Sequence, residues 1–360
     1  MAIINKKIVT ENGDVFAGEG FGCDKDAVVE LVFNTSMAGY GEIMSDPSYT
    51  DQGVVMTYPL IGNYGIAGED YESSGASPGA LIVREHCLCP SNFRFEKTVD
   101  EGLCERGMVG ISGVDTRAIT RMLRDRGNCR AIITDIDRPT KECIDIIKAT
   151  PVPHDQVKRV SVKEKELYPV IDEPVFKVAV IDCGAKMNIV RSLNELGCSV
   201  TVLPWDASFE DVFATTPDGV LISNGPGDPI DADKTIETVR KLLGVMPMMG
   251  ICLGNQILAL AVGAKTYKLK YGHHGGNHPV KNLRTGKIDI TSQNHNYAVD
   301  PESLAGTGFE VSHVNLLDNT VEGIYSERLQ AFGVQYHPES APGPHDSGYV
   351  FRQFLELMKG

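Results

Sequence analysis

The residues best suited to chemistry lie at positions 250–254, which read Gly-Ile-Cys-Leu-Gly. An apolar run precedes them at 245–249, and helix-forming residues follow at 255–261. A nucleophile between two glycines, after a strand and before a helix, is typical of a nucleophile elbow, here with sulfur in place of a hydroxyl. The positive end of the helix dipole would favour the thiolate of Cys252. Taken alone, the segment fits a buried structural cysteine equally well.

A thiolate that attacks an unactivated amide needs a group that protonates the departing amine. Among nine histidines, His337 is favoured because it ends a predicted strand at 331–336 and is followed by Pro338 and Glu339. Side chains two apart in an extended chain point the same way, so Glu339 can hold one tautomer of the imidazole. An unconnected surface His and Glu would be the simpler interpretation in isolation. The presence of Cys252 at another strand end of the same predicted sheet favours catalysis.

Three further segments contain groups that could bind a substrate or a metal ion. The loop 223–229, Ser-Asn-Gly-Pro-Gly-Asp-Pro, is a poor phosphate cradle because its prolines lack amide donors and no Lys-Ser/Thr follows. It suits close backbone approach instead, so amides near Gly225 and Gly227 could join the N–H of Leu253 in an oxyanion hole; a plain turn is the alternative. The segment 272–279 has three histidines in flexible glycine turns, but no adjacent carboxylate or cysteine, and we predict no metal site. Residues 293–297, which include His295, resemble a polar recognition loop.

The second half of the chain must position these groups. Strands are predicted at 177–182, 199–203, 219–223 and 245–251, and helices at 186–196, 209–215 and 233–243. Nearly continuous apolar strands that alternate with helices predict an α/β fold with a doubly wound, mostly parallel sheet. Active sites in such sheets lie at the carboxyl ends of the strands, where Cys252 and the loop 223–229 fall.

The first half predicts a separate mixed α/β domain. An Asn-Gly turn predicts a hairpin over 8–16, with further strands at 28–33, 54–57 and 80–83. The stretch 34–49 is interpreted as a polar loop. Helices are predicted from an Asp115 cap to Gly127, where four arginines suggest a solvated face in preference to an anion site, and at 140–149. Proline and charge at 151–174 predict a linker, which gives domains at 1–150 and 175–360.

The net charge, the apolar segments and the cysteines of the chain indicate which partners and which cellular compartment to expect. The 360 residues carry a formal net charge of -14, which argues against nucleic acid or an anionic membrane as partner. No apolar stretch reaches the ~18 residues of a membrane span, and the N-terminus lacks the apolar core of a signal peptide. Nine cysteines without regular spacing suit a reducing compartment. We therefore expect a soluble cytoplasmic protein.

These motifs resemble those of class I, triad-type glutamine amidotransferases. The resemblance rests on residues 250–256, the loop 223–229 and the His-Pro-Glu at 337–339. The segments 33–49, 272–279 and 342–346 are similar to those of carbamoyl-phosphate synthetase small chains. The resemblance covers nearly the whole chain, although Asn255 replaces a common histidine, and Asn296 with Tyr297 replaces Gly-Phe or Gly-Tyr.

The resemblance implies a role for each matching residue. Cys252 would be the nucleophile, His337 the acid and base, and Glu339 its partner. A second set would bind glutamine: Ser48, Gly225, Gly227, Leu253, Gln256, Asn294, Asn296 and Tyr297. The replacement of glycine by Asn296 puts its main-chain contact in question, because some glycine conformations are hard for other residues to reach.

The function implied is that of a glutaminase subunit. It would hydrolyse L-glutamine through a cysteinyl thioester and deliver ammonia to a large chain in a heterodimer, or in higher oligomers, for pyrimidine or arginine biosynthesis. This chain would need no cofactor, since ATP, Mg²⁺ and bicarbonate would act on the large chain, and it has no Walker-type nucleotide motif. The alternatives are a stand-alone cysteine hydrolase of γ-glutamyl amides and a non-catalytic regulatory subunit.

Overall fold

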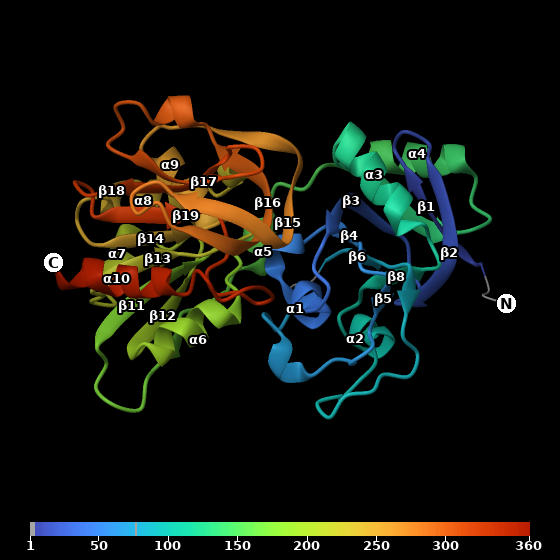
Figure 1. Ribbon diagram of the computed structural model, residues 1–360, viewed down its shortest axis with the longest axis horizontal. Coiled ribbons are helices and arrows are strands. Elements are labelled where there is room, and N and C mark those ends of the chain that lie inside the picture. Colours follow the sequence, from blue (N-terminus) through green and yellow to red (C-terminus); the bar gives the residue numbers. More distant parts are fainter. Residues whose placement is uncertain (1–3, 76–77) are drawn as a thin grey trace. The chain divides into compact units, whose positions relative to one another are not determined.

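The computed structural model describes residues 4–75 and 78–360, which form two compact units (Figure 1). The first unit extends to Pro153 and also contains Lys270–His274. The second unit contains His154–Leu269 and Gly275–Gly360. No helix in the described ranges is both long enough and apolar enough to cross a lipid bilayer.

A closed seven-stranded barrel is the centre of the first unit. Its strands, in order around the barrel, are β1 (Lys6–Thr10), β2 (Val15–Gly22), β8 (Val109–Ser112), β6 (Ala80–Ile82), β4 (Gln52–Met56), β3 (Ala27–Asn34) and β9 (Cys129–Asp135). The predicted hairpin is confirmed, because β1 and β2 pair antiparallel with Ile8 opposite Phe16. The turn between them has Gly13 at φ 89°, in the left-handed region that glycine reaches without strain.

Helices and short elements cover this barrel. They are α1 (Tyr40–Ser45), α2 (Val99–Glu105), α3 (Thr116–Arg126), α4 (Thr140–Ala149), two 3-10 turns (Pro47–Tyr49 and Gly68–Asp70) and a small sheet of β5 (Leu60–Ile61) with β7 (Glu85–His86). The prediction of a continuous loop over 34–49 was wrong. Tyr40, Ile43 and Met44 have helical spacing and are buried in the core, which stabilises α1. The two predicted helices are confirmed, and Asp115 caps α3 by accepting a hydrogen bond from Ala118 N at 2.9 Å.

The second unit is built on a ten-stranded sheet. Its order is β10 (Glu166–Tyr168), β12 (Cys198–Pro204), β11 (Phe176–Asp182), β13 (Gly219–Ile222), β14 (Met248–Ile251), β19 (Ala331–Val334), β18 (Val321–Ser326), β17 (Glu310–Asn315), β15 (Thr266–Asn282) and β16 (Ile288–Val299). The five strands from β12 to β19 are parallel. Two of these strands therefore end beside each other where the predicted chemistry lies, β14 before Cys252 and β19 before His337.

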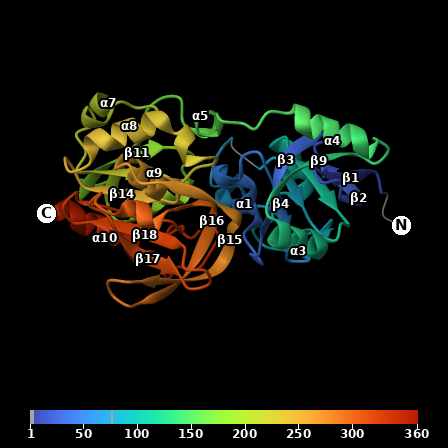
Figure 2. The same ribbon diagram turned by 90° about the horizontal axis from the view of Figure 1, so that it is seen from above.

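Helices cover both faces of the parallel strands (Figure 2). On one face, α7 (Phe209–Phe213), α8 (Asp233–Leu242) and α9 (Leu253–Ala261) share a core with Ala179 and Ile181 of β11. On the other face, α6 (Met187–Glu195) and α10 (Tyr349–Lys359) share a core with Val178 and Val180 of the same strand. This alternation along β11 explains why strands of this kind are apolar throughout. Residues 151–174 include α5 (Gln156–Val160) and β10, and β10 pairs antiparallel with β12.

The rest of this sheet was not predicted. Strands β15 to β18 include the segments that had been interpreted as glycine turns at 272–279 and as a recognition loop at 293–297. The predictions of turns at 272–279 and of a loop at 293–297 were wrong, whereas recognition by residues 293–297 stays a prediction. His295 is a buried residue of β16, since its ring and the polar side chains around it satisfy each other inside the protein.

Candidate active site

Cys252 lies at the turn between β14 and α9, as the sequence predicts. It is the N-cap residue of α9 and has φ 53° and ψ -103°, a backbone conformation that residues other than glycine rarely adopt. A Cβ atom on Gly250 would lie 2.5 Å from the backbone of Gly254, and one on Gly254 would lie 2.2 Å from the carbonyl oxygen of Ile222. The two glycines are therefore sterically required for this turn.

The sulfur of Cys252 is almost completely buried, and two of its polar contacts come from Asn294 and Gln335. It donates a hydrogen bond to the carbonyl oxygen of Asn294 at 3.6 Å, and it accepts one from Nε2 of Gln335 at 3.6 Å. The backbone N–H of Cys252 donates to Val334 O at 2.8 Å, which ties the turn to β19. The thiol thus has a fixed position at the carboxyl end of the sheet.

The predicted pair of His337 and Glu339 is also buried, and Nδ1 of the imidazole lies 2.7 Å from Oε1 of the carboxylate. The assumed extended chain was wrong, because β19 ends at Val334 and the pair lies in the following bridge and turn. Because Nδ1 of His337 is hydrogen-bonded to Glu339, Nε2 is the ring nitrogen that can exchange a proton with the substrate. Burial alone would lower the pKa of His337, but the charge of Glu339 and the side chain of Cys252 raise this pKa to about 10.

Lys186 is a charged group that the sequence analysis missed. Its Nζ lies 2.7 Å from Oε1 of Glu339, and the lysine side chain is only 2% exposed. Burial by itself raises the pKa of a carboxyl, but Lys186 and His337 lower the pKa of Glu339 to about 2. Glu339 is therefore ionised throughout the neutral range and is shared by two cationic partners. The sequence offered one signal for Lys186. This residue lies shortly after the carboxyl end of β11, at the same edge of the sheet as Cys252.

Gln335 is a second residue that the sequence analysis missed. Its Oε1 accepts hydrogen bonds from Nε2 of Gln256 at 3.0 Å and from Nδ2 of Asn255 at 3.4 Å. Two donors on one side fix the amide so that its NH₂ group faces the sulfur of Cys252. Gln335 is completely buried, and it belongs to the same short segment as His337.

The residues predicted to bind glutamine are divided between the two units. Ser48 belongs to the first unit, where it lies buried in the 3-10 turn that Asp46 caps. The others lie in the second unit: Gly225, Gly227, Leu253, Gln256, Asn294, Asn296 and Tyr297. Within it, a Cβ on Gly225 would lie 2.8 Å from the side chain of Leu253, and Asn294 touches the sulfur, so parts of three segments meet near Cys252.

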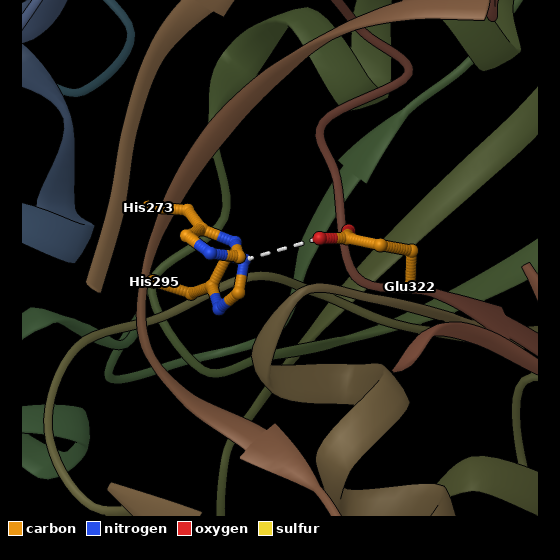
Figure 3. A group of neighbouring side chains, drawn as sticks. All are labelled: His273, His295 and Glu322. Atoms are coloured by element: carbon orange, nitrogen blue, oxygen red, sulfur yellow. Dashed lines mark ion pairs between the residues drawn. The ribbon is translucent and has the colours of Figure 1, made fainter. Parts of the chain in front are cut away.

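A buried polar layer holds this part of β16 in place. Nδ1 of His295 lies 2.8 Å from Tyr297 O, and its Nε2 lies 2.9 Å from Oε1 of Gln293. Gln293 in turn donates to Glu322 at 2.9 Å. Figure 3 shows Glu322 reaching toward His295, at a nitrogen-to-oxygen distance of 3.9 Å. Tyr297 O also accepts a hydrogen bond from Nε2 of Gln256 at 2.8 Å, which connects this layer to α9.

The two departures from the family pattern have different structural outcomes. Asn296 is absent from the described non-glycine residues with positive φ, so the backbone at this position does not need glycine's conformational freedom. Asn255 is completely buried beside Gln335, and its Oδ1 has no hydrogen-bond partner within the described ranges. The conformational doubt about Asn296 is therefore removed, whereas Asn255 carries an unsatisfied acceptor.

Comparisons with known proteins match both halves of the chain. The family model of glutamine amidotransferase class-I matches residues 179–357, and that of the carbamoyl-phosphate synthase small chain, CPSase domain, matches residues 8–133. The chain is 49% identical over 352 residues to the carbamoyl phosphate synthase small chain of Staphylococcus epidermidis (strain RP62A), which covers 98% of this chain and 95% of that one. The protein of the same name from Bacillus caldolyticus is 49% identical over 356 residues, with 99% and 97% covered. A pyrimidine-specific small chain from Halalkalibacterium halodurans is 46% identical over 356 residues, with 99% and 98% covered.

Proposed function

This chain belongs to the family of carbamoyl-phosphate synthase small chains, and we propose that it hydrolyses glutamine at Cys252 and supplies the ammonia to a large partner chain. The observation that carries the site assignment is the buried arrangement of a thiol at the start of α9 with a His337–Glu339 pair beside it. The relatives cover nearly the whole chain and are named as small chains, which implies a large one.

The first step is attack of the Cys252 thiolate on the side-chain carbonyl carbon of glutamine. A carbon–sulfur bond forms, and the carbonyl electrons move to oxygen. The backbone N–H of Leu253, the first residue of α9, has no preceding helical turn to donate to and can hold this oxyanion. Gly225 packs against Leu253, which puts its backbone next to the same site.

The second step is loss of ammonia. With a pKa of about 10, His337 carries a proton at neutral pH, and it gives this proton to the nitrogen as the carbon–nitrogen bond breaks. Water, deprotonated by the neutral imidazole, then attacks the thioester, and glutamate and the thiolate leave. The chain needs no cofactor for this reaction. ATP, Mg²⁺ and bicarbonate would be used by the large chain in a heterodimer that can assemble further.

The contacts of Gln256 support the proposed glutamine pocket. Both N–H groups of the Gln256 amide are used internally, by Gln335 and by Tyr297 O, so its Oε1 is the atom that would accept a hydrogen bond from glutamine. Asn294 and Asn296 flank the buried His295, whose contacts fix their strand. Ser48 is kept in the proposal as a further residue that would bind glutamine. The division of the chain into a small-chain domain, a linker and an amidotransferase domain is part of the same proposal.

Substitution of the nucleophile tests this function. In the reconstituted pair of chains, Cys252→Ser should lower glutamine-dependent synthesis of carbamoyl phosphate by about a thousandfold or more, because the nucleophile is removed. Ammonia-dependent synthesis should continue, and Cys89→Ser, at an exposed cysteine, should change neither rate. Unchanged glutamine-dependent synthesis in Cys252→Ser would refute the assignment. Full glutamine turnover by the isolated wild-type chain would instead favour a stand-alone hydrolase.

A further inference from the structure

A groove in the first unit is lined by four arginines and one acidic residue. Its volume is about 820 Å³, and it is bordered by Thr57, Pro59, Arg84, Asp115, Thr116, Arg117, Thr120, Arg121 and Arg124. Such a concentration of positive charge is unexpected in a chain with a net charge of -14. None of these residues belongs to the proposed amidotransferase site.

The arginines come from two elements that the fold brings together. Arg117, Arg121 and Arg124 have i, i+4 and i+7 spacing, so they share one face of α3, while its buried Ile119 and Leu123 hold the helix on the barrel. Arg84 follows β6, and its guanidinium lies 3.5 Å from the carbonyl oxygen of Gly113. The groove is thus fixed on a rigid barrel.

Most of this charge is not neutralised by the protein. Within the described ranges, Arg117 and Arg121 have neither a hydrogen-bond partner nor an ion-pair partner. Arg124 pairs with Asp125, and the carboxylate of Asp115 is occupied by the cap of α3. By contrast, Arg126 of the same helix lies outside the groove and pairs with Asp14. Arg117 and Arg121, the two arginines of α3 without a partner in the described ranges, both line the groove.

We propose that this groove binds an anion that carries two or three linked phosphates. Arginine holds phosphate through paired N–H donors, and a concave surface concentrates the field of several charges. The volume lies in the range of small-molecule sites. Arg117 and Arg124 are separated by about 10 Å along the helix axis, which is longer than a single phosphate group and suits a chain of them. Thr57 also borders the groove, and its hydroxyl can donate a hydrogen bond to an anion.

Calorimetric titration of the full chain with inorganic pyrophosphate, and with ATP without Mg²⁺, tests this site. Both probes should bind, and their affinity should fall steeply at high salt. The double variant Arg117→Gln/Arg121→Gln should weaken binding by about tenfold or more, whereas Arg126→Gln should leave it unchanged. Tighter binding of ATP than of pyrophosphate would identify a nucleotide as the source of the phosphates.

A second variant keeps the test independent of the stability of α3. Arg84→Gln lies on another element, and it should also weaken binding, while circular dichroism and glutaminase activity report that each variant is folded. Three results would overturn the proposal. They are no binding of either probe, equal affinity in the groove variants and in Arg126→Gln, and tighter binding of a hexaglutamate peptide than of pyrophosphate, which would make the groove a protein docking surface.

Discussion

The ion pairs compared in the two units differ in their exposure to water. In the second unit, Lys186, His337 and Glu339 are buried together behind Cys252, and each carboxylate contact is 2.7 Å long. In the first unit, ion pairs such as Arg126 with Asp14 lie at the surface, at 3.0 Å and with 60% of the arginine side chain exposed. Water screens the surface pairs, but it cannot replace a lost partner in the buried group. Similar distances therefore predict very different consequences of substitution.

Removal of the buried lysine should have the largest effect on stability. Lys186→Met keeps most of the side-chain volume but leaves the second unit with an undercompensated carboxylate at Glu339. The free energy of unfolding of this unit should fall by about 3–5 kcal/mol, as measured by urea denaturation. Glutamine hydrolysis should also fall, because Glu339 would no longer be held in place for His337.

The double variant Lys186→Met/Glu339→Gln is the matched control for this prediction. Because it removes both charges, it should recover part of the lost stability, although not the activity. A decrease below about 1 kcal/mol in the single variant would place this pair with the surface pairs, and the comparison between the two units would then be invalid.

The pH dependence of stability should separate the buried group from the surface in a second way. The raised pKa of His337 means that its protonated form stabilises the fold fully below the ordinary histidine value of 6.5 and loses this effect as pH rises through about 10. The lowered pKa of Glu339 stabilises the fold above 4.5 and loses this effect as pH falls through about 2. The difference in unfolding free energy between wild type and His337→Gln should therefore be largest near pH 5 to 6 and should shrink toward pH 10. A difference that is independent of pH would show that His337 is neutral in the folded protein.

A neutral contact to the sulfur should have a smaller effect. Gln335→Leu removes the N–H donor that faces Cys252, so the thiolate loses a stabilising hydrogen bond. The rate of alkylation of Cys252 by iodoacetamide at neutral pH should fall by about tenfold. Peptide mass spectrometry can follow Cys89 in the same samples, and this exposed thiol should keep its rate. Equal decreases at both cysteines, or none at Cys252, would contradict the role of Gln335.

Sequence patterns predicted the parts of the site that depend on neighbouring residues. The elbow around Cys252 is specified within five positions, because its two glycines meet the backbone of their own turn and of the adjacent strand. His337 and Glu339 were paired correctly, but their turn was not foreseen. Lys186 and Gln335 were missed because their partners lie 153 and 83 positions away. Contacts of that range depend on the order of strands in the sheet, and no local spacing encodes this order.

The same reasoning explains the uneven prediction of the fold. The parallel strands are apolar along their whole length because both faces are covered, so they were found. Strands β15 and β16 carry glycine, histidine and asparagine at buried positions, where a polar layer replaces the apolar pattern. The α1 segment was mistaken for a loop because its helix has only six residues among turn-forming ones. Buried polar side chains and very short helices thus mark where pattern reasoning failed.

The smallest effect is expected at the surface of the first unit. Arg126→Gln removes an ion pair with Asp14 but leaves the helix end, which Gly127 terminates, intact. Both side chains keep access to water, so the free energy of unfolding should change by about 1 kcal/mol or less, and less still at high salt. Urea denaturation at two salt concentrations measures this change directly. A loss of unfolding free energy comparable to that of Lys186→Met would mean that exposure to water does not set the strength of these ion pairs. A small, salt-sensitive change would leave burial as the property that distinguishes the ion pairs of the two units.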